Sequence, residues 1–188
     1  MNIRKSPVCP GVSSMKRNDK NAVSLAGEFA VLSQLALLNY DANMTLGRTK
    51  GVDILVSVPR SKKMYRLEVK TKLRRSDRDV AKSKIFGTVV GGWMMDRKHE
   101  AHVDPLLFYC FVIIWERTKK FCFFIVPSKL VARYVKREHQ LWRREKKKER
   151  KRVKHTDMRV FRIGFKNEKY AIATPTTEEY EDNWKFRR

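Results

Sequence analysis

The stretch GVDILVSVPRSKKMYRLEVKTK, residues 51–72, decides the fold of this chain. It holds two runs of β-branched and aliphatic residues, Asp53–Val58 and Met64–Lys72, on either side of a turn that is rich in Pro, Ser and Lys. Runs of this kind around a short turn are typical of two antiparallel strands. The sequence therefore predicts a β-hairpin, around which the rest of the chain can be placed.

Acidic residues stand at unusual positions in this hairpin. From residue 41 to residue 75 the chain carries ten Lys or Arg residues, and two of its few acids, Asp53 and Glu68, lie at the edges of apolar strands instead of in loops. Side chains alternate between the two faces of a strand, so Glu68 and Lys70 project from the same face. The sequence therefore predicts two carboxyl groups and one amine close together at one end of a sheet.

The pairing register decides how close these groups come. We expect Val58 to pair with Met64 across the turn. Asp53 then lies opposite Val69, give or take one residue, and therefore beside Glu68. A slip of one residue moves every side chain to the other face, so the spacing leaves the direction of the Asp53 side chain open. A twist or bulge at the strand end would turn it toward Glu68.

Two carboxylates and a lysine at one sheet end suit a specific kind of chemistry. Mg²⁺ and similar hard cations prefer oxygen ligands, commonly one or two carboxylates with waters completing the shell. A bound cation lowers the pKa of its water and stabilises charge on a phosphoryl oxygen, and a neighbouring lysine can orient that water or balance the charge. Asp53, Glu68 and Lys70 are therefore candidate catalytic residues for phosphodiester hydrolysis.

A third carboxylate is expected to face the same sheet. Apolar residues recur at helical spacing and predict a helix over residues 22–38; they are Leu25, Phe29, Leu32 and Ala36. Glu28 lies inside this apolar stripe, where a carboxylate is costly unless it is paired or binds a metal. Its alternative role is to favour the first turn of the helix. Gly27 has no side chain and would allow the helix to approach the sheet closely.

These motifs together resemble a known group of enzymes. Their order along the chain is Gly27-Glu28 on a helix, GVDIL around Asp53, and LEVK around Glu68 and Lys70. This order looks like the PD-(D/E)xK nuclease superfamily, which has the restriction-endonuclease-like fold. Val52 stands where the signature has Pro, a residue that many members of the superfamily lack. The segment 107–127 is also similar to the strand pair that follows the motif in small stand-alone members.

The resemblance implies a fold and a set of roles. The fold would be α/β, of mixed α+β character, with a restriction-endonuclease-like core in which helices flank a central mixed sheet. Asp53, Glu68 and Glu28 would hold Mg²⁺ or Mn²⁺. The backbone carbonyl of Val69 would be a further ligand, and Lys70 would support the nucleophilic water. The implied activity is that of an endonuclease, and the preference for DNA over RNA rests on the resemblance alone.

The rest of the chain predicts one domain with a long basic helix. Residues 1–20 are interpreted as a flexible arm, and residues 21–188 as a single nuclease-like domain. Apolar runs predict strands over 106–115 and 121–126, and a helix over 128–154 begins with Ser128 as its N-cap. The stretch 73–100 gives no clear pattern: its charged residues at 74–79 suggest a loop, and Gly91-Gly92 is interpreted as another break. Residues 160–165 are expected to form a last strand.

Charge and cysteine content restrict the partners. The net charge of +23 favours polyanions, either nucleic acid or an anionic membrane surface. The longest apolar run, 106–115, is too short to span a bilayer, and the N-terminal segment lacks the apolar core of a signal peptide. Three widely spaced cysteines in no metal-binding pattern fit a reducing compartment. We therefore expect a cytoplasmic protein with no membrane partner.

The basic helix and one lysine of the hairpin are candidate nucleic-acid contacts. Apolar positions vanish after Trp142, and phosphate contact is expected from Arg143, Arg144, Lys146, Lys147 and Lys148. Lys72 continues the face of Glu68 and Lys70 and is a further candidate. A solvated surface is the alternative for both groups. His99 and His102 form no metal-ligand pattern and are interpreted as a coincidence within a loop.

Two other functions fit this composition. A catalytically inactive, basic nucleic-acid-binding protein of the same fold is the main alternative, although such a protein does not need Asp53 and Glu68, which repel phosphate unless a cation intervenes. A basic subunit of a ribonucleoprotein assembly is the second alternative. The sequence leaves open the cleavage specificity, the biological pathway and whether the chain forms a homodimer.

Overall fold

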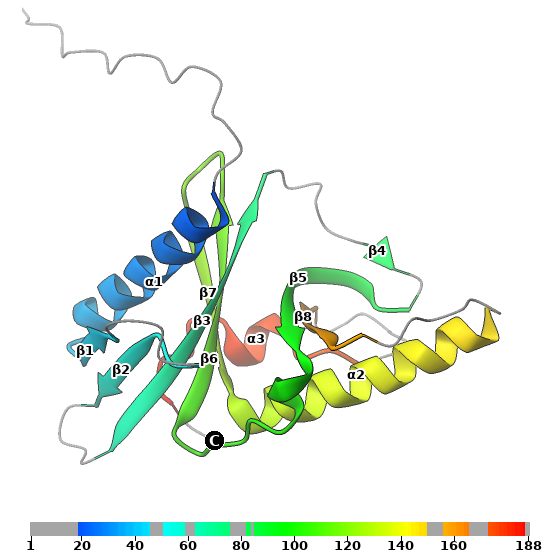
Figure 1. The fold of residues 1–188 in the computed structure, drawn as a ribbon. Helices are drawn as coiled ribbons and strands as arrows, with labels where there is room; N and C mark the ends of the chain where they lie inside the picture. The colour runs from blue at the N-terminus through cyan, green and yellow to red at the C-terminus, as the bar shows by residue number, and fades with distance from the viewer. Residues whose placement is uncertain are drawn as a thin grey trace, which may run out of the picture.

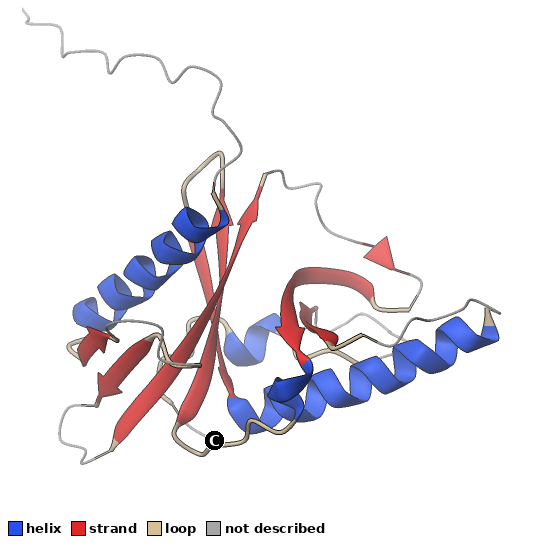
Figure 2. Cartoon of the chain, viewed as in Figure 1, coloured by secondary structure: helices blue, strands red, loops and turns tan. Residues whose placement is uncertain are grey.

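The computed structural model describes residues 19–45, 51–58, 63–75, 82–83, 85–149, 156–165 and 173–186. The predicted N-terminal arm therefore lies outside the described residues, apart from its last two positions. Figure 1 shows a helix, a central sheet, a smaller sheet and a long second helix arranged in layers. Figure 2 shows the same arrangement by type of secondary structure.

The central sheet has five strands in the order β1-β2-β3-β6-β7. Their bounds are Asp41–Met44, Ile54–Ser57, Met64–Arg74, Leu107–Trp115 and Phe121–Pro127. β3 and β6 pair in parallel, whereas every other neighbouring pair in this sheet is antiparallel. The predicted hairpin is thus β2–β3, and the sheet is mixed.

A second sheet packs beside the first and has the order β4-β5-β8. Its strands span Lys82–Ser83, Gly87–Asp96 and Met158–Gly164, and a short 3-10 helix, η1, follows β5 over Arg97–Glu100. The chain between β3 and β6 forms β4, β5 and η1, so this sheet contains most of the crossover that a parallel pair requires.

Helices flank the central sheet on both sides. α1, Lys20–Leu37, lies on one face, while α2, Ser128–Lys148, and the second sheet lie on the other (Figure 1). A short α3, Thr177–Tyr180, packs near β7. Apolar side chains of β6 are buried on both faces, because Phe108 and Cys110 face α1 while Tyr109 and Phe111 face the second sheet. The predicted class, a mixed central sheet flanked by helices, is confirmed.

α1 turns a different face to the sheet from the one that the apolar pattern indicated. Leu25 and Phe29 are exposed, whereas Gly27, Val31 and Leu35 are buried. The reason is the close contact at Gly27, where an added Cβ would lie 1.8 Å from Oγ1 of Thr71. The helix thus approaches β3 along the side where it lacks a side chain, as expected for Gly27, and the larger apolar residues are left outside.

The break predicted at Gly91-Gly92 was wrong, because a strand spans both residues. β5 is a ten-residue strand that continues through Gly91-Gly92 without interruption. The pairing of β5 with β8 shifts register between Val89 and Gly91, which marks a β-bulge. The Trp93 ring occupies the space beside Gly91, where an added Cβ would lie 2.4 Å from it. These glycines accommodate a bulge and a packed ring, so they do not end the strand.

The N-cap of α2 lies one residue before the predicted one. Pro127 is the N-cap, and Ser128 is the first helical residue. The Ser128 hydroxyl instead donates to the backbone carbonyl of Asp104 at 2.7 Å and accepts from its N–H at 3.0 Å. The helix is followed to Lys148, and residues 150–154 of the predicted span lie outside the described part. No described helix combines the length and apolar character needed to cross a membrane.

Candidate active site

The β2–β3 register differs by one residue from the expected one. Ser57, not Val58, lies opposite Met64. Turn geometry sets the register of a hairpin, and composition does not fix it. Extended by one residue, the observed register sets Asp53 opposite Glu68, where the expected register set it opposite Val69.

Asp53 bends back onto β3 from the residue before β2 begins. Its backbone N–H donates to the carbonyl of Leu67 at 2.8 Å, and its carboxylate Oδ2 accepts from the N–H of Val69 at 2.6 Å. Burial raises the pKa of Asp53, and the negative charge of Glu28 adds to the increase, while the hydrogen bond from Val69 opposes it. The carboxylate is thus held beside the backbone that joins Glu68 to Lys70.

Glu68 is buried and held through one of its two oxygens. Oε1 lies 2.6 Å from Nζ of Lys70 and 3.3 Å from Nε2 of His99. Oε2 is buried and has no hydrogen-bond partner among the described residues. Burial by itself raises the pKa of Glu68, but the hydrogen bond from His99 and the charge of Lys70 outweigh it and lower the pKa to about 2. Glu68 is therefore a carboxylate at neutral pH.

Gly51 borders the bare oxygen of Glu68. Its φ is +76°, in the region that favours glycine, and an added Cβ would lie 3.5 Å from Oε2 of Glu68 and 3.1 Å from Cε1 of His102. Nδ1 of His102 lies 3.4 Å from the hydroxyl of Tyr109, the residue that pairs with Glu68 across the parallel ladder. Burial raises the pKa of Tyr109, and so do the negative charge of Glu68 and the approach of the Tyr109 hydroxyl to that carboxylate.

Glu28 is close enough to Asp53 to affect it. Glu28 is half-buried, and its Oε1 accepts from the hydroxyl of Ser24 at 3.2 Å. Its charge contributes to the raised pKa of Asp53, so both carboxylates share one electrostatic environment. Lys72 is exposed at the surface of β3, two residues beyond Lys70.

The carboxylates of this site could provide a cation with one or two ligands, but not with a cluster of three. No three His, Cys, Asp or Glu side chains in the described part of the chain are grouped so that they could hold a metal ion. A hard cation needs only one or two carboxylates when carbonyls and waters complete its shell. The buried, unpartnered Oε2 of Glu68 fits such a ligand set, because a buried carboxylate oxygen without a donor is costly unless a cation approaches it. The Asp53 carboxylate, held on the amide of Val69, is the second carboxylate of the set.

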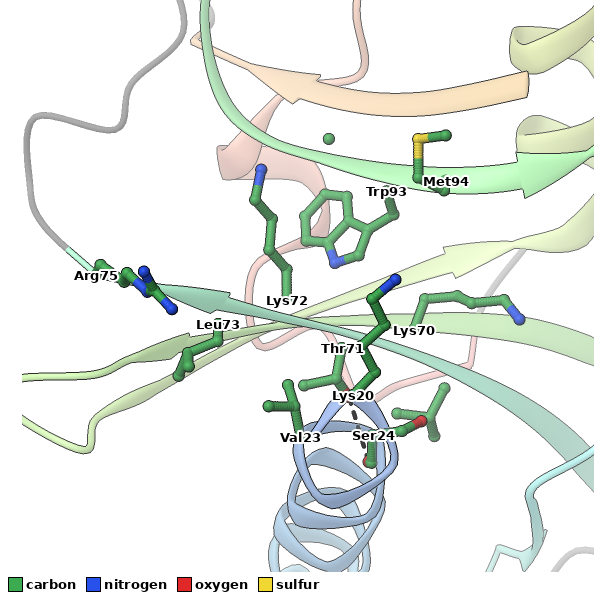
Figure 3. Close-up of a pocket in the computed structure, with 12 residues that line it drawn as sticks. Lys20, Val23, Ser24, Lys70, Thr71, Lys72, Leu73, Arg75, Trp93 and Met94 are labelled. Carbon is green, nitrogen blue, oxygen red and sulfur yellow. Dashed lines mark hydrogen bonds between the residues drawn. The ribbon is translucent and has the colours of Figure 1, made fainter. Parts of the chain in front are cut away.

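A cationic cleft adjoins this site. It has a volume of about 810 Å³ and lies between the first turns of α1, β3 and β5 (Figure 3). Lys20 reaches from α1 toward the sheet, and Lys72 extends toward Trp93 of β5 (Figure 3). The cationic residues that line it are Lys20, Lys70, Lys72 and Arg75, and the lining contains no acid. Such a cleft attracts anions.

The basic end of α2 lies apart from that cleft. The helix extends away from the central sheet toward Lys148 (Figure 1). Arg144, Lys147 and Lys148 are exposed, whereas Arg143 and Lys146 are partly covered. Lys146 pairs with Glu149 at 2.9 Å, and Lys148 pairs with Glu145 at 2.6 Å. Exposed pairs of this kind are weak, so the positive potential of the helix end persists.

Sequence reasoning missed His99, which contacts Glu68. It was assigned to a loop because the 73–100 region lacked periodicity, and its contact partner lies 31 positions away. A local signal was present, since Asp96 and His99 have capping-box spacing. That signal indicates a helix start, although not the contact with Glu68.

Comparisons with known proteins agree with the fold. No family model matches the sequence, and no curated protein matches it. Among solved structures, the chain is similar to that of a bacterial homing endonuclease, I-Ssp6803I, with 11% identity and a TM-score of 0.50. The match covers 89% of this chain and 90% of that chain. At this identity the likeness establishes a nuclease-like fold and nothing about activity.

Proposed function

We propose that this protein is a divalent-metal-dependent nuclease of the PD-(D/E)xK type that cuts phosphodiester bonds within DNA. The observation that supports it best is the state of Glu68. Its Oε1 is held by Lys70 and His99, while its Oε2 is buried without a hydrogen-bond partner among the described residues. A purely structural carboxylate would satisfy both oxygens, because a bare buried oxygen is costly.

Asp53 and Glu68 are the proposed side-chain ligands of Mg²⁺ or Mn²⁺. The carbonyl of Val69 and, through its charge, Glu28 would complete the protein's part of the shell. When bound, the cation would supply a water of lowered pKa and a positive charge for the phosphoryl oxygens. Asp53 is held for this role by the N–H of Val69, which fixes one carboxylate oxygen.

Lys70 is the proposed partner of the attacking water and of the developing negative charge. Its ammonium group lies 2.6 Å from Oε1 of Glu68 and lines the cationic cleft. It can therefore donate to a group that lies between the carboxylates and the cleft. A fixed donor aimed at developing charge lowers the barrier because it needs no reorganisation during the reaction.

The cleft is the proposed path of the cleaved strand. Lys20, Lys72 and Arg75 would contact phosphates next to the scissile bond. The basic end of α2 would contact the backbone at a separate place through Arg143, Arg144, Lys146, Lys147 and Lys148. Phosphate contacts of this kind set the position of the protein and carry no base information.

A cleavage assay tests the proposed function. The purified chain is incubated with supercoiled plasmid, linear duplex, single-stranded DNA and RNA, each with Mg²⁺, Mn²⁺ or EDTA. We expect metal-dependent cutting of DNA, its loss with EDTA, and its loss in Asp53→Ala and Lys70→Ala variants that remain folded by circular dichroism. Binding without cutting under every condition would establish the alternative, an inactive nucleic-acid-binding protein of this fold.

A further inference from the structure

His99 is a buried histidine with polar partners at both ring nitrogens. Its exposed fraction is 3%, and Nε2 lies 3.3 Å from Oε1 of Glu68. On the other side of the ring, Nδ1 lies 3.0 Å from the backbone N of Asp96 and 2.9 Å from the carbonyl oxygen of the same residue. The ring therefore bridges the start of η1 and the carboxylate on β3.

The carboxylate of Glu68 determines that Nε2 of the ring carries a hydrogen. A carboxylate oxygen can only accept a hydrogen bond, so Nε2 must carry the hydrogen that faces Glu68. Nδ1 accepts from the N–H of Asp96 and so completes the capping box of η1. A histidine whose second nitrogen is engaged in this way has its ring orientation fixed, as is common around metal sites.

η1 is itself anchored to the second sheet. Glu100 forms an ion pair with Arg159 of β8, whose side chain is 5% exposed. The His99 ring also packs edge-on against Tyr109 of β6, with ring centroids 5.9 Å apart. The contacts with Asp96 and Tyr109 thus hold the His99 ring independently of Glu68. The ring does not follow Glu68 if that side chain rotates.

We propose that His99 is a positioning residue for Glu68, holding Oε1 so that Oε2 is presented to the divalent cation. This inference rests on the proposed function, since it assigns a purpose to the bare oxygen. Lys70 also holds Oε1, but its long flexible side chain fixes no direction, whereas the imidazole is immobilised by η1 and Tyr109. The histidine therefore sets the carboxylate orientation.

The alternative is that His99 only caps η1, and two substitutions separate the roles. In His99→Asn, the amide oxygen takes the place of Nδ1 and keeps the cap, but the side chain is too short to reach Glu68. In His99→Gln, the amide nitrogen reaches the place of Nε2 and can donate to Glu68. His139→Asn makes the same chemical change on α2, away from the site, and serves as the matched control.

The experiment measures Mn²⁺ affinity by calorimetry without nucleic acid, thermal unfolding in EDTA, and kcat and KM for DNA cleavage. We expect His99→Asn to unfold near the wild-type temperature but to bind Mn²⁺ about 10- to 100-fold more weakly, the usual effect of losing a partner of a metal ligand. kcat should fall while KM for DNA stays constant. His99→Gln should recover part of the affinity, and His139→Asn should match the wild type.

The outcomes distinguish this inference from the proposed function. If the wild type binds Mn²⁺ and His99→Asn weakens that binding, the positioning role stands even if no nucleic acid is cut. If the wild type cuts DNA and His99→Asn binds Mn²⁺ as tightly as the wild type, the positioning role is wrong and the nuclease remains. Equal losses in the Asn and Gln variants, or a wild type without Mn²⁺ affinity, would also overturn it.

Discussion

The carboxylate of Asp53 accepts a hydrogen bond at 2.6 Å from the backbone N–H of Val69, the residue between Glu68 and Lys70. β2 begins only at Ile54, so the Asp53 side chain bonds a β3 amide next to the end of the strand ladder. One contact at the end of the β2–β3 ladder thus holds the carboxylate of Asp53 against the backbone that joins Glu68 to Lys70.

Asp53→Asn is expected to separate these two roles. The amide oxygen can still accept from Val69, whereas the negative charge is lost. We expect unfolding free energy close to the wild-type value but cleavage reduced by more than about 100-fold, since even outer partners of a metal contribute up to that much. Asp53→Ala should lose both. Stability is measured by urea unfolding and cleavage by plasmid nicking, and wild-type cutting by Asp53→Asn would exclude Asp53 as a ligand.

Gly27→Ala is expected to destabilise the protein although alanine favours helices. The added Cβ would lie 1.8 Å from Oγ1 of Thr71, so α1 must move away from β3. Overpacking of this kind costs about 1 to 3 kcal/mol, which outweighs the helix propensity of about 1 kcal/mol.

A double-mutant cycle with Thr71→Ala checks the cause. Removing the hydroxyl and methyl groups should recover part of the loss, giving a coupling energy above about 0.5 kcal/mol between the two positions. Additive effects in urea unfolding would mean that the contact does not limit how closely α1 packs.

Gly51→Ala should affect both stability and cleavage. Its φ of +76° costs about 1 to 2 kcal/mol for a residue with a Cβ. The methyl group would crowd Cε1 of His102 at 3.1 Å and would cover Oε2 of Glu68 at van der Waals contact, 3.5 Å. Gly92→Ala is the control, because its Cβ would make only ordinary contacts, at 3.7 Å or more, and its φ is not positive. We expect lower stability and weaker Mn²⁺ binding for Gly51→Ala alone; equal behaviour of the two variants would contradict the crowding argument.

The end of α2 is expected to contribute to the salt dependence of DNA binding. Each phosphate contact adds about −0.9 to the slope of log K against log salt. Changing the exposed Arg144, Lys147 and Lys148 to Gln should flatten the slope by about 2 to 3 if all three contact phosphate. Binding is titrated in EDTA from ~50 to ~200 mM salt.

A matched variant tests whether location matters for this effect. Arg117, Lys119 and Lys120 lie exposed in the turn between β6 and β7, at the opposite end of β7 from the start of α2. Changing them to Gln removes the same charge and should alter the slope only slightly. If both triple variants flatten the slope equally, net charge explains binding and the helix end makes no specific contact.

Glu138 should make stability depend on pH. It is buried on α2 and pairs with Arg162 of β8. Burial raises the pKa of Glu138 above its ordinary 4.5, and Arg162 only partly opposes this. The folded state therefore holds the proton more tightly, so the contribution of this carboxyl to stability is present below pH 4.5 and is lost as pH rises through the raised pKa.

Comparison with Glu138→Gln isolates that contribution. Gln keeps a hydrogen bond to Arg162 but cannot titrate. The unfolding free energy of the wild type, relative to this variant, should fall as the pH rises from below 4.5 through the raised pKa of Glu138. A difference that is constant with pH would show that Arg162 fully offsets the burial of the carboxylate.

The sequence predicted the parts of this fold that depend on local patterns. The β2–β3 hairpin and the apolar strands β6 and β7 follow from residue type and alternation, and Glu68 and Lys70 share a face because of strand geometry. β5 was missed because Gly91-Gly92 usually marks a break, whereas here the Trp93 ring requires glycine at position 91 and the strand continues through both residues. Packing of this kind cannot be deduced from a window of sequence.

The candidate site was only partly predictable for a related reason. The residues within the hairpin are close in sequence, so Asp53, Glu68 and Lys70 could be grouped, although the register was one residue off. His99 reaches Glu68 only because the β3–β6 crossover folds back over the sheet. The apolar pattern of α1 also indicated the wrong face, since the contact of Gly27 with β3 depends on shape and leaves no apolar signal.

The parallel pairing of β3 with β6 also affects the order of folding. Arg66 pairs with Leu107, so the chain between these two residues must close into a loop before this ladder forms. The conformational entropy of that loop is lost before the strand contacts compensate for it. The β2–β3 hairpin is local and can form early. Because His99 lies within the closed segment, we expect the carboxylates to come together first and to become rigid and shielded only in the slowest step of folding.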